Sequence, residues 1–319
     1  MFEHYQYFLT LAEEGSVTRA AEKLFITHQA LSRYLGKLEK ECGVFLFHRK
    51  PVFSLTPEGQ QLYQTLRQVE LLEKNTMGHF EAQQQQNGGE LNFGTTEGRF
   101  RILIPDLIER YETSFPQVNL HVSSANSKQL QQMLLDNKLD IALCGNLKDP
   151  SPSLESRVIL QEKLYVVISQ GLMQRYFGDQ WETYHEKFKK GADLRLLKSM
   201  PFSQNEPFTN SAQMLERHCH RLYNLQLNFI HVSSQPDLHH ILTTRNYAAS
   251  FCLTMYLTNL KKISEASNNP LYVYPILGLT ETNPVTLVYV KGRQFPRYGQ
   301  AFLRQLQEQV AEFKRYDLM

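Results

Sequence analysis

The sequence predicts an α/β protein with an N-terminal all-α winged helix-turn-helix, a long linker helix and a C-terminal α/β region. Three observations support this fold class. Residues 1–59 combine short amphipathic helical patterns with a turn and a wing. Residues 56–88 keep a narrow apolar seam on a hydrophilic helix. From residue 89 on, apolar strand patterns alternate with amphipathic helix patterns, which is typical of sheets covered by helices.

The first segment is expected to contain three helices, over residues 2–14, 18–24 and 28–42. Ala20 and Ala21 are small enough to let two of these helices approach closely. Apolar residues at helical spacing are expected to bury one face of this segment; they are Leu24, Leu31, Leu35 and Leu38. A small helical core follows from this pattern.

The opposite face of the third helix is polar. The side chains expected there are His28, Gln29, Ser32 and Arg33. A recognition helix needs such a face if its first turns enter the major groove of DNA, where Arg33 can contact guanine and Gln29 can pair with adenine. The alternative is that Ser32 is an ordinary surface hydroxyl and that Arg33 forms a surface ion pair.

Basic side chains are concentrated in this segment although the whole chain carries a formal net charge of only +2. Residues 19–50 hold seven Lys and Arg against three Glu. Such a patch permits phosphate contacts, although a charged run is more often only a solvated face. We expect Arg19, Lys37 and Arg49 to contact phosphates and to set the register of the protein on DNA.

The linker helix begins with Thr56 as a cap, followed by Pro57 at the first helical position. Its apolar residues are spaced by three to five positions: Leu62, Leu66, Val69, Leu72, Met77 and Phe80. This narrow seam predicts pairing with a second copy of the chain by coiled-coil logic. The alternative is a helix that packs on its own domain. Residues 83–89 are expected to end the helix and to form a linker.

Beyond residue 89 we expect a mostly parallel sheet covered on both faces. The predicted strands lie at 91–94, 118–122, 140–144 and 164–169, after which the pattern restarts at 228–232, 248–253, 271–276 and 286–290. The predicted helices lie at 100–115, 128–137, 211–222, 236–245 and 296–314. Two α/β units therefore follow the linker.

Composition narrows the functional classes. Hydrophobic residues make up 42% and charged residues 21% of the 319 residues, which is typical of globular domains. No apolar run approaches the ~20 residues of a membrane span, and no signal core is visible, so we expect a cytoplasmic protein. The four cysteines are scattered and form no Cys-x-x-Cys pair, so no metal is expected. No hydrolase, phosphate-loop or dinucleotide motif is found, and we expect no enzyme.

The run from Phe2 to Gly59 resembles the winged helix-turn-helix of the LysR-type transcriptional regulators. The matching positions are Phe8, Ala12, Gly15, Ser16, Ala20, Ala21, Leu24, Ser32, Leu38, Glu39, Gly43, Leu46, Phe47, Arg49, Leu55, Thr56 and Gly59. The chain departs from the family at His28-Gln29, where Gln-Pro is frequent, and in its short wing.

The resemblance implies a domain organisation. A winged helix-turn-helix DNA-binding domain would occupy residues 1–59, a linker and dimerisation helix 56–88, and an effector-binding domain 89–319. The last would form two Rossmann-like, periplasmic-binding-protein-like lobes, with lobe I at 89–165 plus 270–319 and lobe II at 166–269. The chain would cross between the lobes near 162–169 and 269–276.

A cleft between the lobes is the expected effector site. The resemblance places seven residues along it: Thr95, Thr96, Asn146, Phe202, Ser203, Ser234 and Phe251. Thr95 and Thr96 stand between a strand and a helix N-terminus, where free N–H groups favour an anion, although either hydroxyl could simply cap the helix. Arg99, Arg101 and Lys128 could neutralise an acidic ligand, but each is expected to be a surface charge.

The sequence and the resemblance together predict a sequence-specific regulator that binds a double-stranded DNA operator as a homodimer or homotetramer. No cofactor is expected besides a small-molecule effector, and no membrane partner. Two alternatives remain open, a solute-binding protein and a constitutive DNA-binding protein with an unused cleft.

Overall fold

The computed structural model of the protein describes residues 4–50, 52–83, 88–147, 149–222, 224–267 and 269–318. The chain divides into two compact units. Unit 1 is Met1–Gln86 with residues 135–137 and 292–296, and unit 2 is the remainder. Phe2, the start of the first expected helix, and residues 84–87 of the expected linker lie outside the described residues. Among the described residues, none of the helices combines the length and hydropathy that a membrane span requires.

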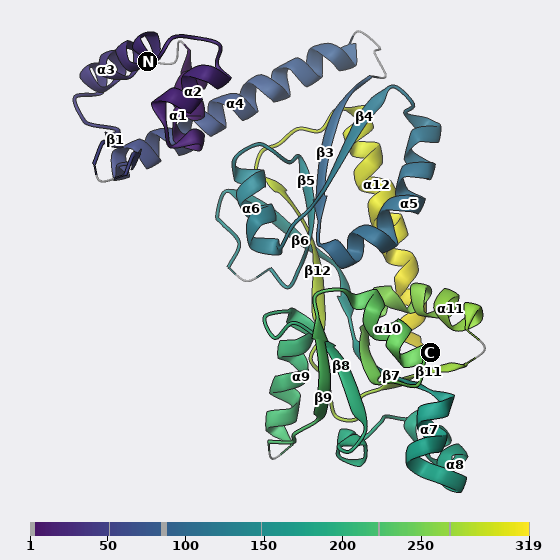
Figure 1. The fold of residues 1–319 in the computed structure, drawn as a ribbon. Coiled ribbons are helices and arrows are strands. Elements are labelled where there is room, and N and C mark those ends of the chain that lie inside the picture. Colours follow the sequence, from purple (N-terminus) through teal and green to yellow (C-terminus); the bar gives the residue numbers. More distant parts are fainter. Residues whose placement is uncertain are drawn as a thin grey trace. The chain divides into compact units, whose positions relative to one another are not determined.

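Unit 1 begins with the three expected helices, α1 (Tyr5–Glu14), α2 (Val17–Lys23) and α3 (His28–Cys42), labelled in Figure 1. The hydroxyl of Thr27 accepts a hydrogen bond from the N–H of Ala30 at 3.2 Å and so caps α3. Buried side chains from all three helices form one core with the wing; among them are Phe8, Leu11, Ala20, Leu31, Leu35 and Leu46. The predicted helical core is confirmed.

The wing is a short antiparallel hairpin of β1 (Phe47–His48) and β2 (Ser54–Leu55), with Phe47 opposite Leu55. Its base is held by the buried carboxylate of Glu39 on α3. One oxygen of Glu39 accepts hydrogen bonds from the N–H groups of Leu46 and Phe47 at 2.9 and 3.4 Å. The wing and the third helix are therefore fixed to each other.

Helix α4 (Pro57–Gln83) starts where the sequence predicts, with the Thr56 hydroxyl accepting from the N–H of Gly59 at 3.0 Å. The apolar seam splits into two parts. Leu62 and Leu66 are buried in the core of unit 1, so the prediction that the whole seam pairs with a second copy is wrong for this half. The other half remains uncovered, because Leu72, Met77 and Phe80 are 64%, 56% and 53% exposed.

Unit 2 contains two five-stranded sheets, one in each lobe. The lobe I sheet has the order β4-β3-β5-β12-β6 and is flanked by three helices; Figure 1 shows α5 and α12 on one side of it and α6 on the other. Its strands are β3 (Gly89–Thr95), β4 (Val118–Ser124), β5 (Ile141–Gly145), β6 (Leu154–Glu162) and β12 (Asn283–Val290). Its helices are α5 (Glu97–Ser114), α6 (Ser127–Leu135) and α12 (Arg297–Glu312).

The lobe II sheet has the order β11-β7-β10-β8-β9. Its strands are β7 (Leu164–Ser169), β8 (Pro201–Asn205), β9 (Asn228–Ser233), β10 (Ala249–Leu253) and β11 (Leu271–Pro275). Its helices are α7 (Gln170–Phe177), α8 (Trp181–Phe188), α9 (Asn210–Arg221), α10 (Pro236–Thr244) and α11 (Leu257–Ala266). Short 3-10 turns are η1 (Gly178–Gln180), η2 (Leu194–Leu197), η3 (Thr254–Tyr256) and η4 (Phe313–Leu318).

The two sheets are mixed, which corrects the expectation of a mostly parallel sheet. In lobe I, β3 pairs parallel with β4 and β5, whereas β12 pairs antiparallel with β5 and β6. In lobe II, β8 pairs parallel with β9 and β10, whereas β7 pairs antiparallel with β10 and β11. The chain enters lobe II from β6 to β7 and leaves it from β11 to β12. The entering and the leaving strands run in opposite directions and lie side by side in each sheet, so they pair antiparallel.

The chain crosses into lobe II at Lys163, between β6 and β7, as predicted. It returns between β11 and β12, over residues 276–282, which lies later than the predicted 269–276. The reason is that β11 pairs with β7 of lobe II, and a strand pattern alone does not show which sheet receives the strand. The sequence also gave no prediction for β6, whose residues are largely exposed, or for the five-residue β8.

Candidate functional site

The polar face of α3 is the first candidate site. His28, Gln29, Ser32 and Arg33 are all exposed there, whereas the leucines of the helix, at 31, 35 and 38, are buried. The helical period places these four polar side chains over the first two turns of α3 on one face. They can therefore meet an external surface together without any change in the core of unit 1.

The three cations predicted for phosphate contact are also exposed, and each is lightly paired. Arg19 contacts Glu14, with its Nε 3.7 Å from the carboxylate. The Nζ of Lys37 lies 3.9 Å from Glu41. Exposed pairs of this kind contribute little stability, so the cations can exchange such a partner for a phosphate.

Arg49 has a second role that the sequence did not reveal. Its Nη2 donates to Glu39 at 3.0 Å, and Glu39 is the residue that holds the wing. The side chain of Arg49 is nevertheless 63% exposed, so the rest of its guanidinium faces solvent. The sequence analysis also missed Phe25, which lies in the turn between α2 and α3 with a left-handed φ of 55° and is almost fully exposed.

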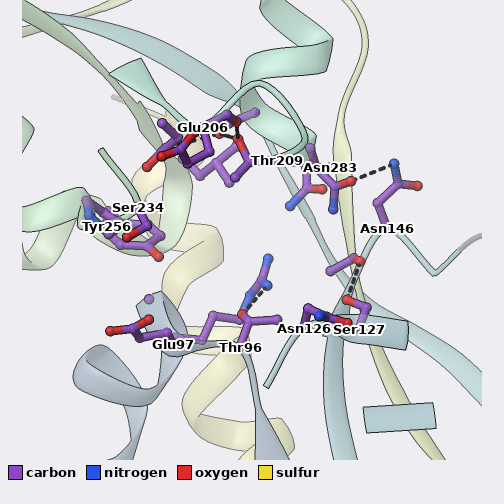
Figure 2. A pocket seen from close by; sticks show the side chains of 18 of the residues that line it. Thr96, Glu97, Asn126, Ser127, Asn146, Glu206, Thr209, Ser234, Tyr256 and Asn283 are labelled. Atoms are coloured by element: carbon purple, nitrogen blue, oxygen red, sulfur yellow. Dashed lines mark hydrogen bonds between the residues drawn. The ribbon is translucent and has the colours of Figure 1, made fainter. Parts of the chain in front are cut away.

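The second candidate site is a cavity of about 740 Å³ in unit 2, lined by residues of both lobes. Lobe I contributes the start of α5, the β4–α6 connection and residues 145–146 at the end of β5. Lobe II contributes the β8–α9 connection, the start of α10 and the end of β10. The cavity wall is rich in hydroxyl and amide side chains; those labelled in Figure 2 include Thr96, Asn126, Ser127, Asn146, Thr209, Ser234 and Asn283.

Four of the seven residues predicted for the cleft line this cavity; they are Thr96, Asn146, Ser234 and Phe251. The other three are buried in the sheets and do not belong to its lining, which corrects the prediction. The hydroxyl of Thr95 donates to the carbonyl of Leu143 at 3.1 Å. Ser203 bonds to His239 at 2.6 Å, and Phe202 stacks on Phe251. Phe202 and Ser203 are neighbours on β8, so their side chains face opposite sides of the lobe II sheet, and both are buried there.

The helix start at the cavity also differs from expectation. Thr96 is the N-cap residue of α5, but its side chain makes no capping bond; instead its hydroxyl accepts from Nη1 of Arg99 at 3.1 Å. Helix α5 therefore begins with uncapped N–H groups beside the cavity. Asn126, in contrast, accepts from the N–H of Gln129 at 3.0 Å and so caps α6.

Arg99 is a buried residue, and the expectation of a surface charge was wrong. Its Nη2 lies 2.5 Å from the carboxylate of Glu162, which is fully buried. Burial acts to lower the pKa of Arg99, but the charge of Glu162 outweighs burial and holds that pKa above its ordinary value. Glu162 also accepts from the side-chain amide of Asn283 at 2.8 Å. The ion pair neutralises the deepest charge of the cavity.

A polar bridge joins the two lobes at the rim of the cavity. Arg101 on α5 donates to Asp237 at 3.0 Å and to Gln235 at 2.7 Å, both at the start of α10. Gln235 in turn donates to Glu97 at 3.0 Å. The lobes also approach closely at Gly98, where a Cβ would lie 1.4 Å from the hydroxyl of Tyr256. The observed lobe arrangement thus depends on specific contacts across the cleft.

Two buried histidines lie behind the lobe II wall. The Nδ1 of His240, which lines the cavity, bonds to Ser250 at 3.1 Å. Burial lowers the pKa of His239 and that of His240 to about 4. Both rings are therefore neutral near pH 7. Among the described residues, no group of three His, Cys, Asp or Glu side chains is placed to hold a metal ion.

Several residues of the cavity wall were not predicted from the sequence, including Glu206, Phe208, Tyr256 and Asn283. No local pattern could have found them, because they come from three separate parts of the chain: the β8–α9 connection, η3 and the start of β12. The one general indication in the sequence is a position just after a predicted strand, because ligands in such folds bind beyond the carboxyl ends of the strands.

Comparison with known proteins defines the family. Residues 2–60 match the bacterial regulatory helix-turn-helix protein of the LysR family, and residues 84–311 match the LysR substrate binding domain. The chain belongs to the LysR family of transcriptional regulators. A similar protein is the uncharacterized HTH-type transcriptional regulator YybE of Bacillus subtilis (strain 168), which is 32% identical over 204 residues, or 61% of this chain and 68% of YybE.

Another relative is the HTH-type transcriptional regulator CysB of Haemophilus influenzae, 28% identical over 130 residues. That match covers 40% of each protein, and a third, with CysL of Bacillus subtilis (strain 168), covers 46% of CysL. The chain thus spans about half the length of most curated relatives that it matches.

Solved structures support the fold over nearly the whole chain. Full-length OxyR from Pseudomonas aeruginosa has a TM-score of 0.65 at 18% identity and covers 96% of this chain and 97% of its own. Full-length CbnR, solved in complex with its target DNA, has a TM-score of 0.53 at 20% identity, and the match covers 97% of this chain and 99% of the CbnR chain.

Proposed function

We propose that this chain is a sequence-specific DNA-binding transcriptional regulator whose activity responds to a small molecule held between its two α/β lobes. The observation that carries the proposal is the exposed polar face of α3, with His28, Gln29, Ser32 and Arg33 on a buried helical core. A helix of this kind reads base edges in the major groove. The proposal assigns no chemical reaction to the chain, and such a regulator works in the cytoplasm, where bacterial DNA lies.

The exposed half of the α4 seam favours a homodimer or homotetramer. Leu72, Met77 and Phe80 are more than half exposed, and apolar side chains at helical spacing on a polar helix suit pairing with a second copy. One recognition helix reads few bases. A pair of them gains affinity and sequence length by binding two half-sites about one helical turn, or a multiple of it, apart.

The effector acts by shifting the population of lobe arrangements. A ligand changes such an equilibrium only by the difference between its affinities for the two states. The rim bridge from Arg101 to Asp237 and Gln235 belongs to one arrangement of the lobes. A ligand that fits the cavity in that arrangement would stabilise it and so change how the assembled regulator holds DNA.

The central test is footprinting of the full chain on the DNA that flanks its own gene, with and without candidate metabolites. We expect a protected site whose footprint changes in the presence of one of the compounds. The variant Thr96→Val should protect the same DNA but lose the response to that compound. A footprint that no compound alters would favour the constitutive alternative, and no DNA binding even at low salt would reject both.

The oligomer is tested separately with Leu72→Glu combined with Met77→Glu. Two buried carboxylates would oppose pairing of α4, so the variant should sediment as a smaller species than the unmodified chain. The matched control is Gln64→Glu, which adds a charge at an exposed polar position of the same helix. An unchanged sedimentation coefficient in the double variant would place the subunit interface elsewhere.

A further inference from the structure

The charges that line the cavity are only partly compensated. Four charged residues belong to its lining: Glu97, Arg99, Lys128 and Glu206. Arg99 is neutralised by Glu162 at 2.5 Å, and Glu97 is engaged by Arg101 at 3.5 Å and by Gln235. Within the described part of the chain, neither Lys128 nor Glu206 has an ion-pair partner. One cation on lobe I and one anion on lobe II therefore face the cavity without a countercharge from the described part of the protein.

The lobe I wall offers hydrogen-bond donors. Lys128 lies in the first turn of α6, and the start of α5 presents N–H groups that no side chain caps. In addition, the Nε of Arg99 has no hydrogen-bond partner among the residues that the structure describes, although Arg99 is only 5% exposed. A buried donor without a partner is costly, so a ligand that supplies an acceptor gains affinity here. A carboxylate has the charge and the lone pairs that such a wall favours.

The lobe II wall offers an acceptor of opposite charge. Glu206 is half-buried in the β8–α9 connection, three residues before Thr209, the N-cap of α9. Figure 2 shows Glu206 and Thr209 on one wall of the cavity and Thr96 and Asn126 on the opposite wall. A carboxylate facing an otherwise uncharged wall favours a cationic group such as ammonium. The two walls thus select different ends of one molecule.

Asn283 adds an acceptor at the cavity wall. Its side-chain nitrogen donates to Glu162 at 2.8 Å, which fixes the orientation of the amide. Its Oδ1 is buried and receives no hydrogen bond from any described residue. A donor on the ligand would satisfy this oxygen, which again favours a molecule with both acceptors and N–H groups.

We propose that the effector of this cavity is an amphoteric molecule with one carboxylate and one ammonium group, as in a free α-amino acid. The inference rests on the proposed function and names the ligand class of the same site. The carboxylate lies against Lys128 and the start of α5, and the ammonium group against Glu206. A dicarboxylate would set its second acid against Glu206, a diamine would set a cation against Lys128, and a polyol would leave both charges uncompensated.

The first experiment measures binding to the full chain. Each common L-amino acid is tested by thermal shift, and the strongest binder is then titrated by calorimetry. Its N-acetyl derivative and its amide are the matched controls, because each lacks one of the two charges. We expect both derivatives to bind at least roughly tenfold more weakly than the parent. No binding by any amino acid, or equal binding of either derivative, would overturn the assignment.

The second experiment assigns the charges to residues. Glu206→Gln should lower the affinity for the amino acid at least roughly tenfold but leave the affinity for its N-acetyl derivative nearly unchanged. Lys128→Gln should lower the affinity for the amino acid by a similar factor but leave the affinity for its amide nearly unchanged. Glu112→Gln and Lys190→Gln are matched controls at exposed positions outside the cavity. Unchanged affinity in both Glu206→Gln and Lys128→Gln would refute this arrangement.

The outcome for the proposed function is read from the footprint. If a compound that lacks one of the two charges changes DNA protection through the cavity, the proposed ligand class is wrong, whereas the proposed function as an effector-controlled regulator is retained. If an amino acid binds with the expected charge dependence but never alters DNA protection, the ligand class stands and effector control of DNA binding is wrong.

Discussion

The polar face of α3 and the cavity between the lobes use polar side chains in opposite ways. On α3, Gln29 and Arg33 are exposed and take no part in the core of unit 1. In the cavity wall, Arg99 is buried and paired with Glu162. The carboxylate of Glu162 also accepts hydrogen bonds from the side-chain amide of Asn283 and from the N–H of Met255. The α3 face can therefore vary in sequence at little cost in stability, whereas part of the cavity wall is also structural. Substitutions can break or sharpen this contrast.

The largest effect is expected for Arg99→Ala. The change leaves the fully buried carboxylate of Glu162 without its countercharge, and removal of one partner from a buried ion pair costs about 3–5 kcal/mol. Urea denaturation measures the loss. Arg99→Met combined with Glu162→Gln is the control, because it removes both charges and keeps an oxygen for Asn283; this variant should recover much of the loss. If Arg99→Ala were as stable as the wild type, the cavity wall would have no structural role that distinguishes it from the α3 face.

The next effect depends on pH. Burial holds the pKa of His239 and of His240 near 4, below the ordinary value near 6.5, so between these values the unfolded chain binds more protons than the folded one. Their contribution to stability is complete above about pH 6.5 and is lost as the pH falls toward 4. Each histidine should contribute a slope of up to about 1.4 kcal/mol per pH unit.

Urea denaturation between pH 7 and 4.5 checks this slope, and the double variant His239→Gln, His240→Gln is the comparison. The variant should be less dependent on pH whatever its absolute stability. Parallel stability curves for the two proteins would mean that other groups control acid unfolding.

A smaller effect, and no effect on folding, is expected at α3. Arg33→Ala and Gln29→Ala should each reduce discrimination between the operator and unrelated DNA by about 1–3 kcal/mol, the contribution of one bidentate base contact. Competition binding measures discrimination, and urea denaturation should give wild-type stability because both side chains are exposed. Unchanged discrimination would move base recognition to another surface of unit 1.

The smallest effect is expected at the rim bridge. Arg101→Ala removes the contacts with Asp237 and Gln235, but the arginine is about half exposed, so the change is worth only about 0.2–1 kcal/mol. The apparent affinity for the effector should fall no more than about fivefold. Arg110→Ala breaks an exposed pair with Glu312 within lobe I and should leave that affinity unchanged. Equal responses of the two variants would show that the bridge does not couple the lobes.

The sequence by itself determined unit 1 and its polar surface. Three helices and the exposed set from His28 to Arg33 follow from helical periodicity, because every residue involved lies within a few turns of its neighbours. The split of the α4 seam did not follow, since Leu62 and Leu72 have the same pattern and differ only in whether the core of unit 1 covers them.

The tertiary structure alone decided the cavity. Thr95 and Thr96 are adjacent and chemically alike, but the alternation of the strand turns Thr95 into the sheet and leaves Thr96 at the cavity. Arg99 and Glu162 are 63 positions apart, so their ion pair cannot be read from spacing. Which charge is neutralised and which remains free, as at Lys128 and Glu206, depends on contacts between distant segments, and such contacts exist only in the folded chain.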